Sequence, residues 1–118
     1  MLSGLFRRKA TGQIAQGDVL LVPIDALPVT AERETIHPSN LTVLAYGEVT
    51  GHAHRVHGET RHFRDTKQEH ISYLQVIGKD VSLKHEEHGP HALTTGGLYQ
   101  VVKQREFPRE APPRQVAD

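Results

Sequence analysis

The apolar residues of this chain occur in short β-branched and aliphatic runs that are separated by glycine, proline and polar turns. Such runs are too brief for typical helices and fit single β-strands. No extended amphipathic helix is available to connect parallel strands. The sequence therefore predicts an all-β fold, a small antiparallel barrel or sandwich of six to seven short strands. The predicted strands cover residues 19–24, 41–46, 52–57, 60–64, 71–77, 81–85 and 98–103.

The predicted strands lie in one segment, which we expect to be a single β domain over residues 16–104. Residues 1–15 are predicted to be a mobile N-terminal arm, and residues 105–118 an extended tail that contains three prolines. The connection over residues 29–38 is polar and is bounded by prolines, so it allows at most one short helix, with Thr30 as its cap.

Composition narrows the classes of function. The 118 residues include 14 Lys and Arg, 14 Asp and Glu, and no cysteine. The balanced charge provides no overall field that would attract nucleic acid or an anionic membrane, so such binding would need a local patch. The lack of cysteine excludes disulfides, thiolate ligands and cysteine nucleophiles. With no secretory signal and no long apolar segment, we expect a cytoplasmic protein.

The histidines are concentrated in one part of the chain. Eight of the nine lie between His52 and His91, in a first cluster over residues 51–57, a second over residues 85–91, and two positions between them. Imidazole is the commonest metal ligand and also the side chain that titrates nearest neutral pH. A metal site and a protonation-sensitive surface are therefore the two leading explanations.

Strand periodicity orients the candidate ligands. His52 and His54 are two residues apart and would share one face of a strand with Val56, while His85 ends the apolar stripe of Val81 and Leu83. His88, His91 and a carboxylate, Glu87 or Glu48, would complete the shell from flanking segments. The predicted metal ligands are His52, His54, His85, His88, His91 and Glu87. Without thiolates, the cofactor would be a divalent transition metal, with zinc, iron, manganese and nickel all open.

The order of Gly47, His52, His54 and Glu59 is similar to the first motif of the cupins, a family of metal-binding jelly rolls. The glycine spacer is one residue shorter than in that motif, and no Pro-X-Gly precedes His85, where the second motif would require it. The likeness covers about thirteen residues and does not assign the family. It adds Glu59 as an alternative carboxylate ligand.

Two kinds of function remain open at this stage. A metal-dependent enzyme would act on a small molecule that the sequence does not identify, and its catalytic residues are unknown. The alternative is a non-enzymatic module that binds nucleic acid or a protein through a basic and histidine-bearing surface with one aromatic residue. The residues predicted for that surface are Arg55, Arg61, Phe63, Arg64 and Lys67.

Overall fold

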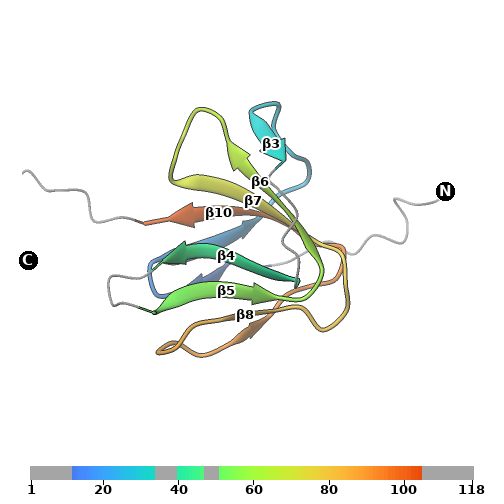
Figure 1. Ribbon diagram of the computed structural model, residues 1–118. Helices are drawn as coiled ribbons and strands as arrows, with labels where there is room; N and C mark the ends of the chain where they lie inside the picture. The colour runs from blue at the N-terminus through green and yellow to red at the C-terminus, as the bar shows by residue number, and fades with distance from the viewer. Residues whose placement is uncertain (1–11, 34–39, 47–50, 105–118) are drawn as a thin grey trace, which may run out of the picture.

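The computed structural model describes residues 12–33, 40–46 and 51–104, which form two antiparallel β-sheets that face each other (Figure 1). The six-stranded sheet contains, in spatial order, β1 (Ile14–Gln16), β2 (Val19–Pro23), β10 (Leu98–Lys103), β7 (Ile71–Val76), β6 (Thr60–Asp65) and β3 (Ala31–Arg33). The four-stranded sheet contains β4 (Leu41–Tyr46), β5 (Ala53–His57), β8 (Ser82–Lys84) and β9 (His91–Ala92). The sheets do not close on each other, so the fold is sandwich-like and not a barrel.

The all-β prediction is confirmed, and each of the seven predicted runs contains a strand. Three short strands were not predicted: β1, β3 and β9. Strand β1 begins at Ile14, inside the segment expected to be an arm. Strand β3 occupies part of the connection that allowed a short helix, because Ala31–Arg33 pair with Phe63–Asp65 along the edge of β6. Residues 34–39, residues 1–11 of the predicted arm and the predicted tail lie outside the described residues.

No helix within the described ranges has the length and apolar character that crossing a bilayer requires.

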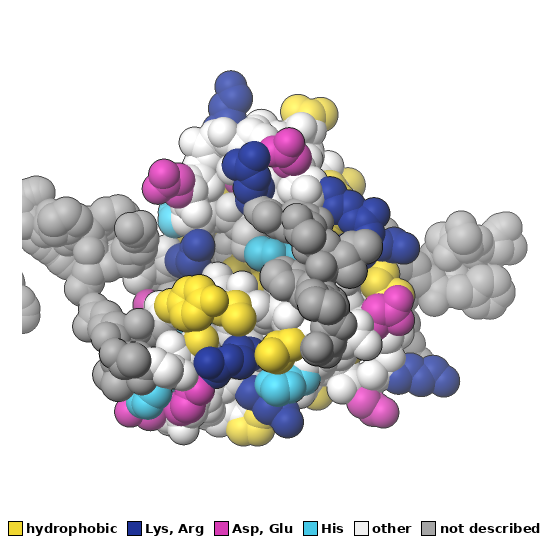
Figure 2. Space-filling view, viewed as in Figure 1, with side chains coloured by type: hydrophobic (Ala, Val, Ile, Leu, Met, Phe, Trp, Pro, Cys, Tyr) yellow, Lys and Arg dark blue, Asp and Glu magenta, His cyan; other side chains and the backbone are white. Residues whose placement is uncertain are grey.

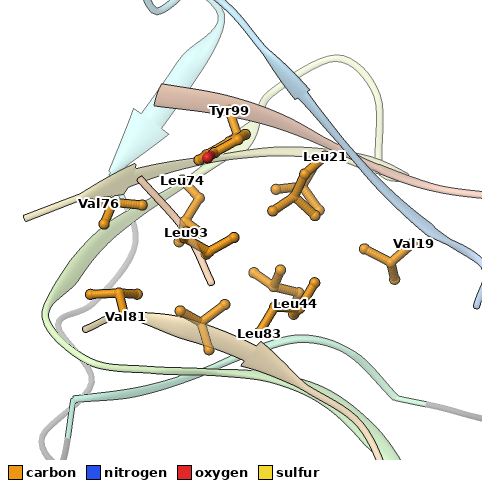
Figure 3. Close-up of a cluster of buried hydrophobic side chains, with 11 residues drawn as sticks. Val19, Leu21, Leu44, Leu74, Val76, Val81, Leu83, Leu93 and Tyr99 are labelled. Atoms are coloured by element: carbon orange, nitrogen blue, oxygen red, sulfur yellow. The ribbon is translucent and has the colours of Figure 1, made fainter. Parts of the chain in front are cut away.

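The hydrophobic core lies between the two sheets and follows from the alternation of side chains along each strand. Val19 and Leu21 of β2 are buried, as are Leu74 of β7 and Tyr99 of β10. They face Leu83 of β8 and other side chains from the opposite layer (Figure 3). Full burial of such a side chain contributes about 1.5–3 kcal/mol, so this cluster is the main source of stability.

A buried carboxylate holds together one end of the six-stranded sheet. Asp65, at the end of β6, is 6% exposed and accepts hydrogen bonds from Tyr73 Oη at 2.6 Å and Thr30 Oγ1 at 2.8 Å. It also accepts bonds from the backbone N–H groups of Lys67 and Gln68. These donors, with Tyr73 the strongest, lower the pKa of Asp65 from 3.8 to about 2. The ionised carboxylate therefore joins β6, β7 and the entry to β3.

Truncation of a core leucine tests the packing between the sheets. Leu74 is 0% exposed. We expect Leu74→Ala to lower the free energy of unfolding by roughly 2–5 kcal/mol, because it removes apolar contacts and leaves a cavity. The control Val29→Ala changes a side chain that is 100% exposed and should stay within about 0.5 kcal/mol of wild type. Urea denaturation measures both, and equal effects would contradict the assigned core.

A second prediction concerns Asp65. Tyr73→Phe removes a hydrogen bond to a charged group and should destabilise the fold by roughly 1.5–3 kcal/mol at pH 7, whereas Tyr46→Phe, at a side chain 78% exposed, should have little effect. Because the folded pKa of Asp65 is lowered, its contribution is fully present above about pH 4 and is lost as the pH falls toward 2. The difference between Tyr73→Phe and wild type should therefore shrink in acid. A difference that is constant from pH 7 to pH 2 would show that the bond does not depend on the ionised carboxylate.

Candidate metal centre

Four histidine rings from the two sequence clusters lie together at one end of the sandwich. The ring centroids of His54 and His85 are 4.3 Å apart, and those of His85 and His88 are 4.7 Å apart. His52 approaches His85 edge-on, with centroids 5.7 Å apart. His85 is thus the common neighbour of the other three rings.

Strand pairing brings the two clusters together. Strands β5 and β8 are antiparallel, with Arg55 opposite Lys84 and Val56 opposite Leu83. Continuing this register past the end of β8 places His54 opposite His85 and the residue at position 52 opposite position 87. The contact between His52 Nδ1 and Glu87 Oε2, at 3.6 Å, agrees with that register. The candidate centre is therefore an extension of the β5–β8 ladder.

His54 points inward from β5, on the same face as Val56, and is only 2% exposed. Its Nδ1 lies 2.8 Å from Gln16 Oε1, and its Nε2 lies 3.1 Å from Asp18 Oδ1. Burial, followed by the nearby His85, lowers the pKa of His54, although the hydrogen bond with Asp18 opposes the shift. The neutral ring is therefore favoured at neutral pH.

The partners of His54 come from the tight hairpin between β1 and β2. Gln16 pairs with Val19 across a two-residue turn made of Gly17 and Asp18. Gly17 has a φ of +59°, and glycine is the residue that such a first turn position favours. A Cβ at Gly17 would also lie 2.8 Å from His88 Nε2. Glycine is therefore required here both for the turn and for the close approach of the ring.

Glu86 fastens the segment after β8 to β5. Its Oε1 accepts a hydrogen bond from the backbone N–H of Ala53 at 2.9 Å, and its Oε2 pairs with Arg55. These two interactions, the first of them the larger, lower the pKa of Glu86 from 4.5 to about 2. The carboxylate is thus ionised at neutral pH, and it holds the neighbouring His85 beside His52.

His85 has a defined proton position in this arrangement. Its Nδ1 accepts a hydrogen bond from the backbone N–H of Glu87 at 3.0 Å. Because that nitrogen uses its lone pair as an acceptor, the proton of the neutral ring is on Nε2. Metal binding through Nε2 would therefore require this hydrogen bond to break.

The predicted ligands are divided among several positions. His52 and His85 join Glu86 in a group whose potential ligand atoms all lie within 4.8 Å of one another. The rings of His54 and His88 both contact the ring of His85, and the carboxylate of Glu87 contacts His52.

Three further candidates have different surroundings. His91 is in β9, opposite Leu83, and is not among the ring contacts of the described residues. Glu59 follows β5, and its carbonyl accepts hydrogen bonds from the backbone N–H groups of Ile77 and Gly78. Glu48 lies outside the described residues.

Sequence reasoning did not identify Gln16, Asp18 or Glu86 as site residues. The segment Gln16-Gly17-Asp18 has the residue types of a turn, which it forms, but nothing in it indicates a histidine partner. The contact from Asp18 to His54 spans 36 residues, so only the packing of the two sheets creates it.

The residues predicted for a nucleic-acid surface are distributed over both sheets. Arg55 is in the four-stranded sheet and pairs with Glu86, whereas Arg64 is in β6 and pairs with Glu32. By strand alternation Arg61 and Phe63 lie on the opposite face of β6 from Arg64. Basic and acidic side chains are interspersed on the face in Figure 2. The geometry therefore favours the histidine cluster as the candidate site.

Comparison with known families gives a match over residues 15–104 to the family described as Domain of unknown function (DUF8820). The chain belongs to this family. No curated protein and no solved structure matches it. The DUF8820 region contains the ten strands of the described residues, except for the first residue of β1, together with the histidine cluster and its partners Gln16 and Asp18. The candidate centre is thus part of the DUF8820 domain itself.

The Gln16 side chain provides a test of the centre's framework. Gln16 is 2% exposed, and its Nε2 donates to the carbonyls of Leu83 and Gly89. Gln16→Leu keeps a similar volume but leaves these buried groups without their partner, so we expect a loss of roughly 1–3 kcal/mol in the free energy of unfolding. Gln68→Leu, at an exposed position, is the matched control. Thermal and urea unfolding compare the two, and equal stability would refute the importance of this network.

Proposed function

We propose that this domain binds a divalent transition metal through His52, His85 and Glu86. The observation that supports the proposal is the convergence of two imidazoles and one carboxylate, with potential ligand atoms within 4.8 Å of one another. Two histidines and a glutamate are an established ligand set for zinc in enzymes. Zinc, iron, manganese and nickel all accept nitrogen and oxygen donors of this kind.

The movements that binding requires are small. Donor atoms that share one zinc ion are about 3–4 Å apart, so these three need to approach by roughly 1 Å. Use of Nε2 of His85 would break its hydrogen bond with the N–H of Glu87, at a net cost of about 0.5–1.5 kcal/mol. That cost is small beside the roughly 10–16 kcal/mol with which proteins bind structural zinc.

Groups around the three ligands would affect how the ion is bound. Glu86 keeps its bonds to Ala53 and Arg55 through one lone pair on each oxygen and has further lone pairs for a metal. Glu87 lies beside Nδ1 of His52, where it would favour a protonated Nδ1 and so a free Nε2. Three protein ligands also leave coordination positions for water or substrate, which is the arrangement of catalytic zinc sites. We therefore propose metal-assisted chemistry on a small molecule as the activity to test first.

Metal analysis of purified, untagged protein tests the proposal. We expect at least one equivalent of zinc, manganese, iron or nickel per chain, either as purified or after addition to the chelator-treated protein. The double variant His52→Ala and His85→Ala should weaken the Kd by more than the roughly 10–100-fold that changes to outer partners of a metal site produce.

The matched control is the double variant His57→Ala and His70→Ala, at two histidines outside the cluster, of which His57 is exposed and His70 is half-buried. It removes as many imidazoles as the test variant and should leave the Kd unchanged. Equal weakening by both variants would indicate adventitious binding to surface histidines. No uptake of any of the four metals by the folded wild-type chain would refute the proposal.

A further inference from the structure

A cleft of about 460 Å³ lies beside β6, β7 and β10, at the same end of the sandwich as the histidines. Lys103, at the end of β10, is opposite Val19 of β2, and the N–H of Gln104 donates to the carbonyl of Asp18 at 2.7 Å. In Figure 1 the start of β7 and the end of β10 lie on the same side as the start of β5, which carries His54. The volume is typical of small-molecule sites. Its described lining includes none of the three proposed metal ligands, so the cleft is separate from that centre.

The lining of the cleft contains a buried hydroxyl that the fold does not use. Ser72 of β7 is 5% exposed and belongs to the lining. It is two residues before Leu74, so it faces the space between the sheets as Leu74 does. Its Oγ is buried and makes no hydrogen bond with any residue that the structure describes. Because a buried hydroxyl without a partner is destabilising, a ligand atom that pairs with it would recover free energy on binding.

A lysine projects from the same face of the sheet beside this hydroxyl. Ser72 is opposite Val101 in the β7–β10 ladder, and Lys103 follows Val101 by two residues, so Lys103 is the diagonal neighbour of Ser72. Side chains in this relation can reach each other when one of them is long. Lys103 is half-buried, in line with the buried Tyr99 and Val101. Within the described ranges, no carboxylate pairs with its ammonium group.

The other charges of the lining are compensated or exposed. Arg64 of β6 is paired with Glu32. Asp65 also lines the cleft, but each of its oxygens already accepts two hydrogen bonds. Lys67 and Glu69 are both exposed, where water weakens their fields. Among the described lining residues, the half-buried lysine of β10 is therefore the charge that most needs a partner, which favours an anionic ligand.

Apolar side chains provide the rest of a small-molecule site. Leu44 of β4 contributes to the lining from the opposite sheet, where it also belongs to the core cluster (Figure 3). Ile71, at the start of β7, is a second apolar member of the lining. Ligand sites combine apolar surface of this kind with a few polar groups that fix orientation. A ligand with an anionic group and an apolar body therefore matches the cleft.

We propose that this cleft binds a small organic anion. Its carboxylate or phosphate oxygens accept hydrogen bonds from Lys103 Nζ and Ser72 Oγ, and its apolar body contacts Leu44. Both kinds of head group offer the same chemistry to the two donors, namely negative charge on several acceptor oxygens. The proposal goes beyond the proposed metal centre and does not require a bound ion.

Titration of the full chain with phenyl phosphate and with benzoate tests the proposal, after metal has been removed with a chelator and the chelator dialysed away. Benzyl alcohol has the same ring without the charge and is the control ligand. We expect at least one of the two anions to bind saturably by calorimetry, and amide NMR shifts to concentrate at residues 64–72 and 103. The anion that binds more tightly identifies the head group. Binding of neither anion at millimolar concentration, or equal binding of benzyl alcohol, would overturn the proposal.

Lys103→Met tests the cation in the cleft. It keeps an unbranched apolar side chain but removes a charge-assisted hydrogen bond, so we expect the Kd of the anion to rise by about 10–100-fold. Lys79→Met, at an exposed lysine in the turn after β7, is the matched control and should leave the Kd unchanged. Equal weakening by both variants would mean that the anion responds only to overall charge, which contradicts a defined site.

Ser72→Ala separates binding from a structural role. Because the hydroxyl has no partner among the described residues, its removal should leave the stability of the ligand-free chain in urea unchanged or higher. The Kd of the anion should rise by about 2–10-fold. Ser82→Ala, at a half-buried serine of β8, is the matched control and should bind the anion as wild type does. A loss of stability with an unchanged Kd would assign the hydroxyl to the fold and overturn its role in binding.

The double variant His52→Ala and His85→Ala distinguishes this proposal from the proposed function. It should lose the metal but bind the anion with the wild-type Kd. Loss of anion binding in this variant would place the anion at the histidines and overturn the cleft as its site. Anion binding by a chain that takes up no metal would refute the metal centre and support the cleft.

Discussion

The buried carboxamide of Gln16 connects the two sheets at the end where the histidines meet. Gln16 belongs to β1 of the six-stranded sheet. Its carboxamide makes three hydrogen bonds, to the carbonyls of Leu83 and Gly89 and to the ring of His54, and all three partners belong to the four-stranded sheet or its connections. A buried amide in which each group is paired stabilises one arrangement of its neighbours, because any slip would leave polar atoms without partners. The position of the β1–β2 hairpin against β5 and β8, and with it the position of Asp18, depends on this residue.

The space between the sheets changes character along its length. Its centre is filled by aliphatic side chains and Tyr99, which provide most of the stability but no chemistry. At one end, His54 occupies an inward-facing position of β5, and His85 follows the apolar stripe of β8. Both histidines stand where the rest of the space between the sheets has apolar residues. An imidazole that is buried at such a position loses its hydration, and without hydrogen-bond partners this loss would destabilise the fold. The network of Gln16, Asp18 and Glu86 provides the hydrogen bonds that make this polar end compatible with a folded sandwich.

The orientation of each ring determines its chemistry more than its proximity to other rings does. His52 approaches His85 edge-on and has a carboxylate beside it, so the two can direct lone pairs toward a common point. The ring of His54 is tilted by 35° from that of His85, and its two nitrogens face Gln16 and Asp18. The four imidazoles thus have different hydrogen-bond partners, although His85 contacts the other three rings. Glu86 links the segment that carries His85 and His88 to the backbone of β5.

The sequence by itself determined the strands, because apolar alternation and turn residues act locally, and it identified His52 and His85 as members of one histidine-rich end. Tertiary structure alone decided that Asp18 and Gln16 contact the ring of His54 and that Glu86 lies beside His52 and His85. Those contacts link segments 33 to 73 residues apart, and they depend on how two sheets stack, for which single residues carry no signal. The same reason explains β3, where Ala31–Arg33 become a strand only because the edge of β6 is available to pair with them.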